Sequence, residues 1–201
     1  TLEVTTRAIE ITADSDEKVY DGIALTNAGS SITDGTLVEG HTYTATLTGS
    51  QTTVGESANV ASAAVIKDAS ENDVTSNYQI SYVAGTLEVT TRAIEITADS
   101  DTKVYDGTAL TNAGSSITDG TLVEGHTYTA TLTGSQTTVG ESANVASAAV
   151  IKDASENDVT SNYQISYVAG TLEVTQRAIE ITADSDSKVY DGTALTDSGS
   201  E

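Results

Sequence analysis

The chain has 201 residues and a formal net charge of −22 at pH 7, from 30 Asp and Glu against 8 Lys and Arg. This acidic excess argues against nucleic acid as a partner, because binding it requires Lys and Arg to displace counterions, and it disfavours anionic membrane surfaces. The chain contains no Cys, which excludes disulfides and thiol chemistry. Met, Trp, Phe and Pro are also absent, so each hydrophobic core is expected to be thin.

An 85-residue repeat organises the sequence. The segment TLEVTTRAIEITADSDTKVYDG at residues 86–107 has close copies at residues 1–22 and 171–192. The two whole copies differ at only two positions, Glu17 and Ile23, each of which is Thr in the second copy. This period exceeds the ~20–50 residues of solenoid coils and suits small autonomous domains.

The first thirteen residues alternate between polar and apolar side chains, but the phase of the alternation changes. Leu2 and Val4 share one parity, whereas Ile9 and Ile11 share the other. Since strand side chains alternate with period two, we predict that TLEVT ends one domain and RAIEITA begins the next, without a flexible linker. This divides the chain into the terminal strand of a preceding repeat, two whole domains and an incomplete third domain: residues 1–5, 6–90, 91–175 and 176–201.

Further along each repeat the sequence predicts short strands separated by frequent turns. In the first copy these strands are residues 18–20, 35–39, 41–48 and 60–67, with loops at 27–34 and 49–59 and a polar turn at 68–76. The clearest is HTYTATLT, in which Tyr43, Ala45 and Leu47 face inward and the Thr residues face out. This pattern predicts an all-β protein made of small β-sandwich domains stacked end to end.

Residues 77–90, NYQISYVAGTLEVT, are predicted to form a β-hairpin. Tyr78 and Ile80 share a face before a turn at Gly85, where glycine would supply the positive φ of a tight turn, and Leu87 follows the turn. The alternative is one long strand with a bulge at Gly85. No apolar pattern of helical spacing persists over three turns, so no sizeable helix is predicted.

Three blocks of each repeat resemble a known family. KVYDGTAL at residues 103–110, GSQTTVGESANV at 134–145 and DVTSNYQISYVAGTLEVT at 158–175 are similar to YDG-type repeat domains of large bacterial surface proteins, and to the related MBG repeats of adhesins. The resemblance implies secretion, tandem copies and a stalk or adhesive role, with no catalytic residues to carry over. It leaves open an immunoglobulin-like sandwich or a β-grasp variant, whose helix would have to lie at residues 57–67.

Carboxylates clustered near the expected domain joint raise the hypothesis of calcium binding, because calcium takes about six to eight oxygen ligands. The candidate ligands are Asp14, Asp16, Asp21, Asp99, Asp101 and Asp106. Their spacing matches no EF-hand or nonapeptide repeat, and a solvated acidic surface is the alternative. Lys18 and Lys67, which have Asn or Asp residues nearby, raise a further alternative, an internal isopeptide bond.

The aromatic residues and histidines suggest no ligand site. Tyr20, Tyr78 and Tyr82 lie on the apolar parity, so we expect them in the core rather than on a sugar-stacking surface. His41 and His126 have no second His or Cys within ligand spacing and are expected on exposed strands. No hydrolase motif of the Gly-x-Ser-x-Gly type is present, so the sequence does not predict an enzyme.

Taken as a whole, the sequence predicts a structural stalk or fibre of a bacterial extracellular or cell-surface adhesin. Its expected partners are neighbouring repeats and, in a fibre, other copies. No apolar run is long enough to insert into a membrane, and we expect export and anchoring segments outside these residues. The alternative is a multivalent module whose repeats bind a glycan or a protein, with avidity from copy number.

Overall fold

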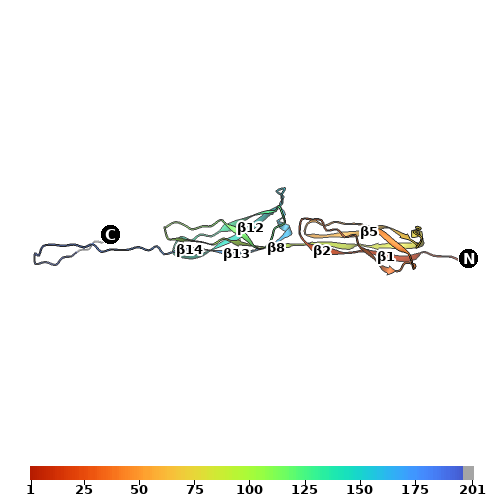
Figure 1. Ribbon diagram of the computed structural model, residues 1–201, viewed down its shortest axis with the longest axis horizontal. Coiled ribbons are helices and arrows are strands. Elements are labelled where there is room, and N and C mark those ends of the chain that lie inside the picture. Colours follow the sequence, from red (N-terminus) through yellow and green to blue (C-terminus); the bar gives the residue numbers. More distant parts are fainter. Residues whose placement is uncertain (197–201) are drawn as a thin grey trace.

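The computed structural model describes residues 1–196 and forms an elongated molecule whose strands follow its long axis (Figure 1). Fourteen strands and two short 3₁₀ helices occur in the described residues. The all-β prediction is confirmed. We call residues 6–90 the first repeat and residues 91–175 the second repeat.

The strands of the first repeat are β1 (Arg7–Ala13), β2 (Asp16–Val19), β3 (Ser30–Gly35), β4 (Thr42–Thr48), β5 (Gly55–Lys67), β6 (Tyr78–Val83) and β7 (Gly85–Thr90). The second repeat contains β8 (Arg92–Ala98), β9 (Asp101–Val104), β10 (Ser115–Gly120), β11 (Thr127–Thr133), β12 (Gly140–Lys152), β13 (Tyr163–Val168) and β14 (Gly170–Thr175). The 3₁₀ helices are η1 (Thr75–Asn77) and η2 (Thr160–Asn162).

Each repeat forms two sheets. In the first repeat their strand orders are β3-β1-β6 and β2-β7-β5-β4, and in the second they are β10-β8-β13 and β11-β12-β14-β9. Alternation in β1 turns Ile9 and Ile11 inward, where they pack with Ala61 and Ile66 of β5 in the opposite sheet. Small and aliphatic side chains therefore fill a thin core between two sheets, as the composition predicted.

The phase change predicted between TLEVT and RAIEITA is confirmed. Leu87 in β7 and Ile94 in β8 are both buried, and Thr91 alone separates the two strands. The first TLEVT copy, residues 1–5, is not part of a strand, whereas the second copy lies in β7 between β2 and β5. That residues 1–5 are the terminal strand of a preceding repeat stays a prediction. Residues 176–196 also contain no helix or strand, and 197–201 lie outside the described residues.

The predicted hairpin at residues 77–90 is wrong, because β6 and β7 belong to different sheets. β6 pairs with β1 in parallel, whereas β7 pairs in parallel with β2 and antiparallel with β5. The chain therefore crosses from one sheet to the other at Ala84, and one long bulged strand in a single sheet does not describe it either. β1 and β2 make the same crossing beside it.

Gly85 is required at this crossing for its lack of a side chain. A Cβ atom at Gly85 would lie 2.5 Å from the carbonyl oxygens of both Ala13 and Asp14. Gly85 is not among the residues with positive φ, so the predicted role in a tight turn is wrong. Glycine is required at this position because the backbones of the two crossing segments lie too close together to leave room for a side chain.

A buried asparagine completes the crossing. Asn59, which is 1% exposed, donates from Nδ2 to the carbonyl oxygens of Asp14 (2.8 Å) and Asn27 (3.1 Å). The backbone N–H of Thr86 donates to Ser15 Oγ at 2.9 Å. Side chains thus satisfy backbone groups where the regular ladder is interrupted.

Two of the predicted loops contain strand residues. Residues 30–35 form edge strand β3, where a loop was predicted at 27–34 and a strand at 35–39. β5 begins at Gly55 inside the predicted loop at 49–59, since its first half pairs with β7 and its second half with β4. Residues 57–67 lie in β5, so they do not supply the helix of a β-grasp fold.

Replacing the crossing glycine in both repeats, by Gly85→Ala and Gly170→Ala, should lower the free energy of unfolding by about 1–3 kcal/mol per repeat, the usual cost of overpacking. Urea unfolding followed by circular dichroism measures this. The adjacent exposed positions give the control, since Thr86→Ala with Thr171→Ala should change stability by less than about 0.5 kcal/mol. An unchanged urea midpoint in the glycine variant would show that the crossing tolerates a Cβ atom.

Candidate functional site

The joint between the two repeats gathers side chains from both of them. Tyr20, directly after β2, donates its backbone N–H to the carbonyl oxygen of Thr90 at 2.9 Å. Its ring lies edge-on to Tyr163 of the second repeat, with ring centroids 5.7 Å apart and planes at 77°. His126 lies 6.2 Å from the same ring, and its Nδ1 is 2.8 Å from the Tyr163 hydroxyl.

A hydrogen bond and a continuous apolar cluster also cross the joint. The backbone N–H of Val54 donates to Oδ1 of Asn162 at 2.8 Å. Tyr20 and Val89 belong to the same buried cluster as Ile94 and Tyr163 of the second repeat. Buried residues at the end of the first repeat therefore belong to one cluster with the core of the second repeat.

Arg92, the first residue of β8, ties both sides of the joint together. Its guanidinium donates from Nη1 to the carbonyl oxygen of Tyr20 at 3.5 Å, and from Nε and Nη2 to the carbonyl and hydroxyl oxygens of Thr121. Arginine offers several donors in a rigid planar group, which suits bridging of this kind.

The effect of contact between the repeats can be seen by comparing corresponding residues, of which one lies at the joint and the other does not. Tyr20 is 4% exposed, whereas its counterpart Tyr105 at the end of the second repeat is 41% exposed. On the opposite surface Asn162 is 3% exposed, whereas its counterpart Asn77 is exposed to solvent. Contact between the repeats, rather than the fold of one repeat, therefore buries these side chains.

The two buried tyrosines of the joint are held in the neutral form. Burial, reinforced by Tyr163 and Asp153, raises the pKa of Tyr20 above its usual value of 10.0. Burial also raises the pKa of Tyr163. Since a phenolate would be desolvated here, the joint favours protonated tyrosines.

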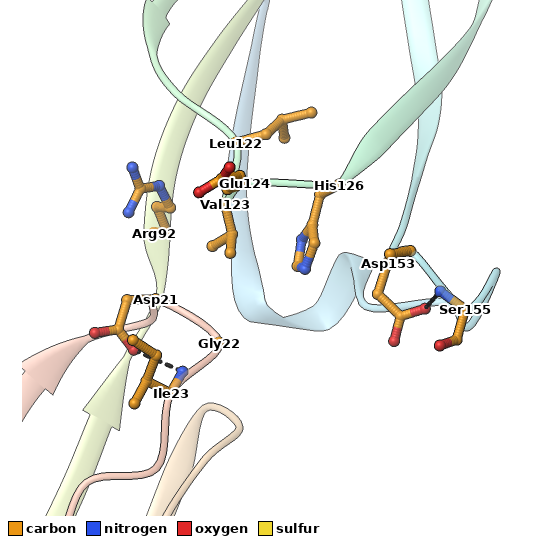
Figure 2. Close-up of a pocket in the computed structure, with 11 residues that line it drawn as sticks. Asp21, Gly22, Ile23, Arg92, Leu122, Val123, Glu124, His126, Asp153 and Ser155 are labelled. Atoms are coloured by element: carbon orange, nitrogen blue, oxygen red, sulfur yellow. Dashed lines mark hydrogen bonds between the residues drawn. The ribbon is translucent and has the colours of Figure 1, made fainter.

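An open cleft of about 540 Å³ lies beside the joint (Figure 2). Asp21 and Ile23 of the first repeat form one wall, and Val123, His126 and Asp153 of the second form the other. Figure 2 also shows that Asp21 accepts the backbone N–H of Ile23 and Asp153 accepts that of Ser155, each from its own loop and not across the cleft. The cleft is thus a wedge between two surface turns, not a set of polar groups that converge on one point.

Four of the six predicted calcium ligands accept hydrogen bonds from residues near them in the chain. Asp21 accepts from Lys18 Nζ at 2.6 Å and from the backbone N–H of Ile23, and these bonds lower its pKa. Asp106 repeats this arrangement with Lys103 at 2.8 Å, and its pKa is also lowered. Asp16 and Asp101 each accept from the backbone of the next residue, while Asp14 and Asp99 stand at the sheet crossing.

The length of β2 separates Asp16 from Asp21, and the length of β9 separates Asp101 from Asp106. A strand rises about 3.3 Å per residue, so Asp16 and Asp21 are on the order of 16 Å apart. Within residues 1–196, no group of three or more Asp, Glu and His side chains is arranged to hold a metal ion. Calcium binding by Asp14, Asp16, Asp21 and their counterparts stays a prediction that the sequence alone supports.

Other expectations for individual residues had mixed outcomes. Tyr20 and Tyr78 are buried as predicted, but Tyr82 is 40% exposed and its hydroxyl accepts the backbone N–H of Ala64. Lys18 and Lys67 form surface ion pairs with nearby acids rather than lying beside a buried amide. Sequence reasoning missed the roles of His126, Asn162 and Arg92, because only contact between repeats distinguishes them from their counterparts.

Comparison with protein-family models found no match to the chain, and comparison with curated proteins found none either. The resemblance to YDG-type repeats therefore rests on the three sequence blocks. In the described part of the chain, no helix has the length and apolar character needed to span a membrane.

Truncating the joint tyrosine, Tyr20→Ala, should lower the free energy of unfolding by about 3 kcal/mol, as for other buried aromatic residues. The matched control is Tyr105→Ala, which removes the same side chain where it is 41% exposed and should cost much less. Thermal and urea unfolding of both variants measure the difference. Equal losses would show that Tyr20 stabilises its own repeat and not the joint.

The joint should weaken at alkaline pH. The pKa of Tyr20 and Tyr163 is raised in the folded protein, so their contribution is fully present below the unfolded pKa of about 10 and is lost as pH rises through the folded pKa. A tyrosinate absorbance titration of wild type and of Tyr20→Phe should show one late-titrating group removed by the substitution. If the variant instead loses an early-titrating group, burial does not protect Tyr20.

Proposed function

We propose that the chain is a structural segment of a bacterial extracellular or cell-surface stalk, without catalytic activity. Its repeats, residues 6–90 and 91–175, would be immunoglobulin-like β domains stacked head to tail. The observation that carries this proposal is the joint, where one residue, Thr91, connects β7 to β8 and one buried cluster continues across. A joint of this kind holds neighbouring units in line, whereas a Gly/Ser linker leaves them free to rotate.

The charge of the chain supports the same proposal. A net charge of −22 makes the sides of neighbouring molecules repel one another, while the joint buries mainly neutral groups. Contacts along the axis are therefore favoured over contacts between sides. Its partners would be neighbouring repeats of the same protein and other copies in a fibre, in agreement with the resemblance to repeats of surface adhesins.

Small-angle scattering of the 201-residue chain tests the rod. The path from Arg7 to Tyr20 along β1 and β2 spans about 45 Å at the usual strand rise, so two repeats in line should reach at least about 90 Å. A rod of that length has a radius of gyration of about 26 Å, against about 16 Å for a compact globule of the same size. A compact particle would contradict the stalk and favour a multivalent binding module.

The same measurement, made with calcium and then with chelator, tests the predicted ligands. We expect one scattering profile under both conditions, because the carboxylates in the described residues are not gathered around one point. A rod that bends on chelation would instead establish calcium sites at the Asp14, Asp16 and Asp21 clusters. Tyr20→Ala is the positive control, since it should loosen the joint in either buffer.

A further inference from the structure

The first two strands of each repeat run beside its last two strands. β1 pairs with β6 from Arg7↔Tyr78 to Thr12↔Val83, and β2 pairs with β7 from Asp16↔Leu87 to Val19↔Thr90. Both ladders are parallel, and in both the partner lies 71 residues further along the chain. They are therefore two parts of one ladder, which passes from one sheet to the other without a change of register.

The ends of this ladder are the points where the chain enters and leaves the repeat. The chain enters at Arg7, at the outer end of β1, and leaves at Thr90, at the end of β7 that meets the second repeat (Figure 1). Tension along the molecule pulls β1 and β7 in opposite directions along their own lengths. Because ladder hydrogen bonds run between the strands, such a pull loads many of them together instead of opening them in turn.

One side chain bridges the ladder where it crosses between the sheets. Ser15 Oγ accepts the backbone N–H of Thr86 at 2.9 Å. Beside this bridge, Asn59 of β5 donates from Nδ2 to the carbonyl oxygen of Asp14 at 2.8 Å and so holds the β1–β2 segment against β5. Beyond β2 the ladder is extended by the backbone bond from Tyr20 to Thr90, at 2.9 Å.

The second repeat has the same bonds at the same lengths. Their donor and acceptor residues are Thr171 with Ser100, Asn144 with Asp99, and Tyr105 with Thr175. The interruption in the strands is therefore not an interruption in hydrogen bonding between the two segments.

We propose that each repeat contains a shear clamp, formed by β1–β2 against β6–β7 and bridged at Ser15, which resists tension along the long axis. This goes beyond the proposed stalk, because a rod can be long and stiff and still unfold easily when it is pulled. The clamp follows from sheet topology and does not depend on what the chain carries or where it is located.

Single-molecule force spectroscopy tests the clamp through the direction of pulling. The chain contains no cysteine, so a pair of introduced cysteines gives unique attachment points. Thr6→Cys with Thr91→Cys pulls the first repeat in shear. Thr53→Cys with Thr91→Cys pulls at the shared end of antiparallel β5 and β7 and peels β7 away one bond at a time. All three positions are exposed.

The clamp requires a clearly higher unfolding force in the shear geometry than in the peeling geometry, at the same loading rate. Complete unfolding between residues 6 and 91 should lengthen the tether by about 240 Å, which identifies the event as loss of the whole repeat. Equal forces in the two geometries would overturn the proposal. This result would leave the scattering test of the rod unaffected, so the two ideas can fail separately.

A matched pair of serine variants tests the bridge within the clamp. Ser15→Ala removes the acceptor of the Thr86 N–H, whereas Ser62→Ala removes a hydroxyl that bonds within β4–β5, away from the terminal strands. In the shear geometry Ser15→Ala should lower the unfolding force and Ser62→Ala should leave it near that of wild type. Equal forces in the two variants would remove Ser15 from the clamp. Circular dichroism confirms that each variant is folded before pulling.

Discussion

The crossing of two parallel strands from one sheet to the other is the constraint on which the rest of this structure depends. β1 and β6 lie side by side in one sheet, and the chain continues from them into β2 and β7, which lie side by side in the other sheet. Both segments cross between the sheets at the same place. The backbones approach so closely that Gly85 admits no side chain, and the buried amide of Asn59 donates hydrogen bonds to the carbonyl oxygens of Asp14 and Asn27. The thin core of Ile and Ala is therefore accompanied by backbone connections between the two sheets at this crossing.

The joint follows from the same ladder. The ladder of β2 and β7 ends at Tyr20 and Thr90, and the first strand of the next repeat, β8, begins two residues later at Arg92. The ring of Tyr20 therefore projects past its own repeat onto Tyr163. No separate linker has to be ordered, so little conformational entropy is lost when the repeats dock.

The sequence predicted those features that depend on local alternation. The phase change at TLEVT and RAIEITA, the strand HTYTATLT and the strand of small residues before Lys67 are all present. Features set by distant contacts were missed. Gly85 looks like a turn glycine, although its requirement comes from Ala13 and Asp14, and β3 has only Ile32 as a large apolar residue to mark it as a strand. The joint could not be predicted because corresponding residues of the two repeats are identical in sequence, and only their neighbours in the structure give them different roles.

The joint also has a direction. The surface that carries Tyr20 and Val54 differs from the surface that carries Asn162 and Tyr163, so the contact is heterologous rather than self-complementary. Heterologous contacts build rings when the rotation between units closes and open linear arrays when it does not. Both surfaces occur on every whole repeat, and the repeats lie along one axis in Figure 1. Addition of further repeats would therefore extend the molecule at its ends, while its acidic sides repel neighbours.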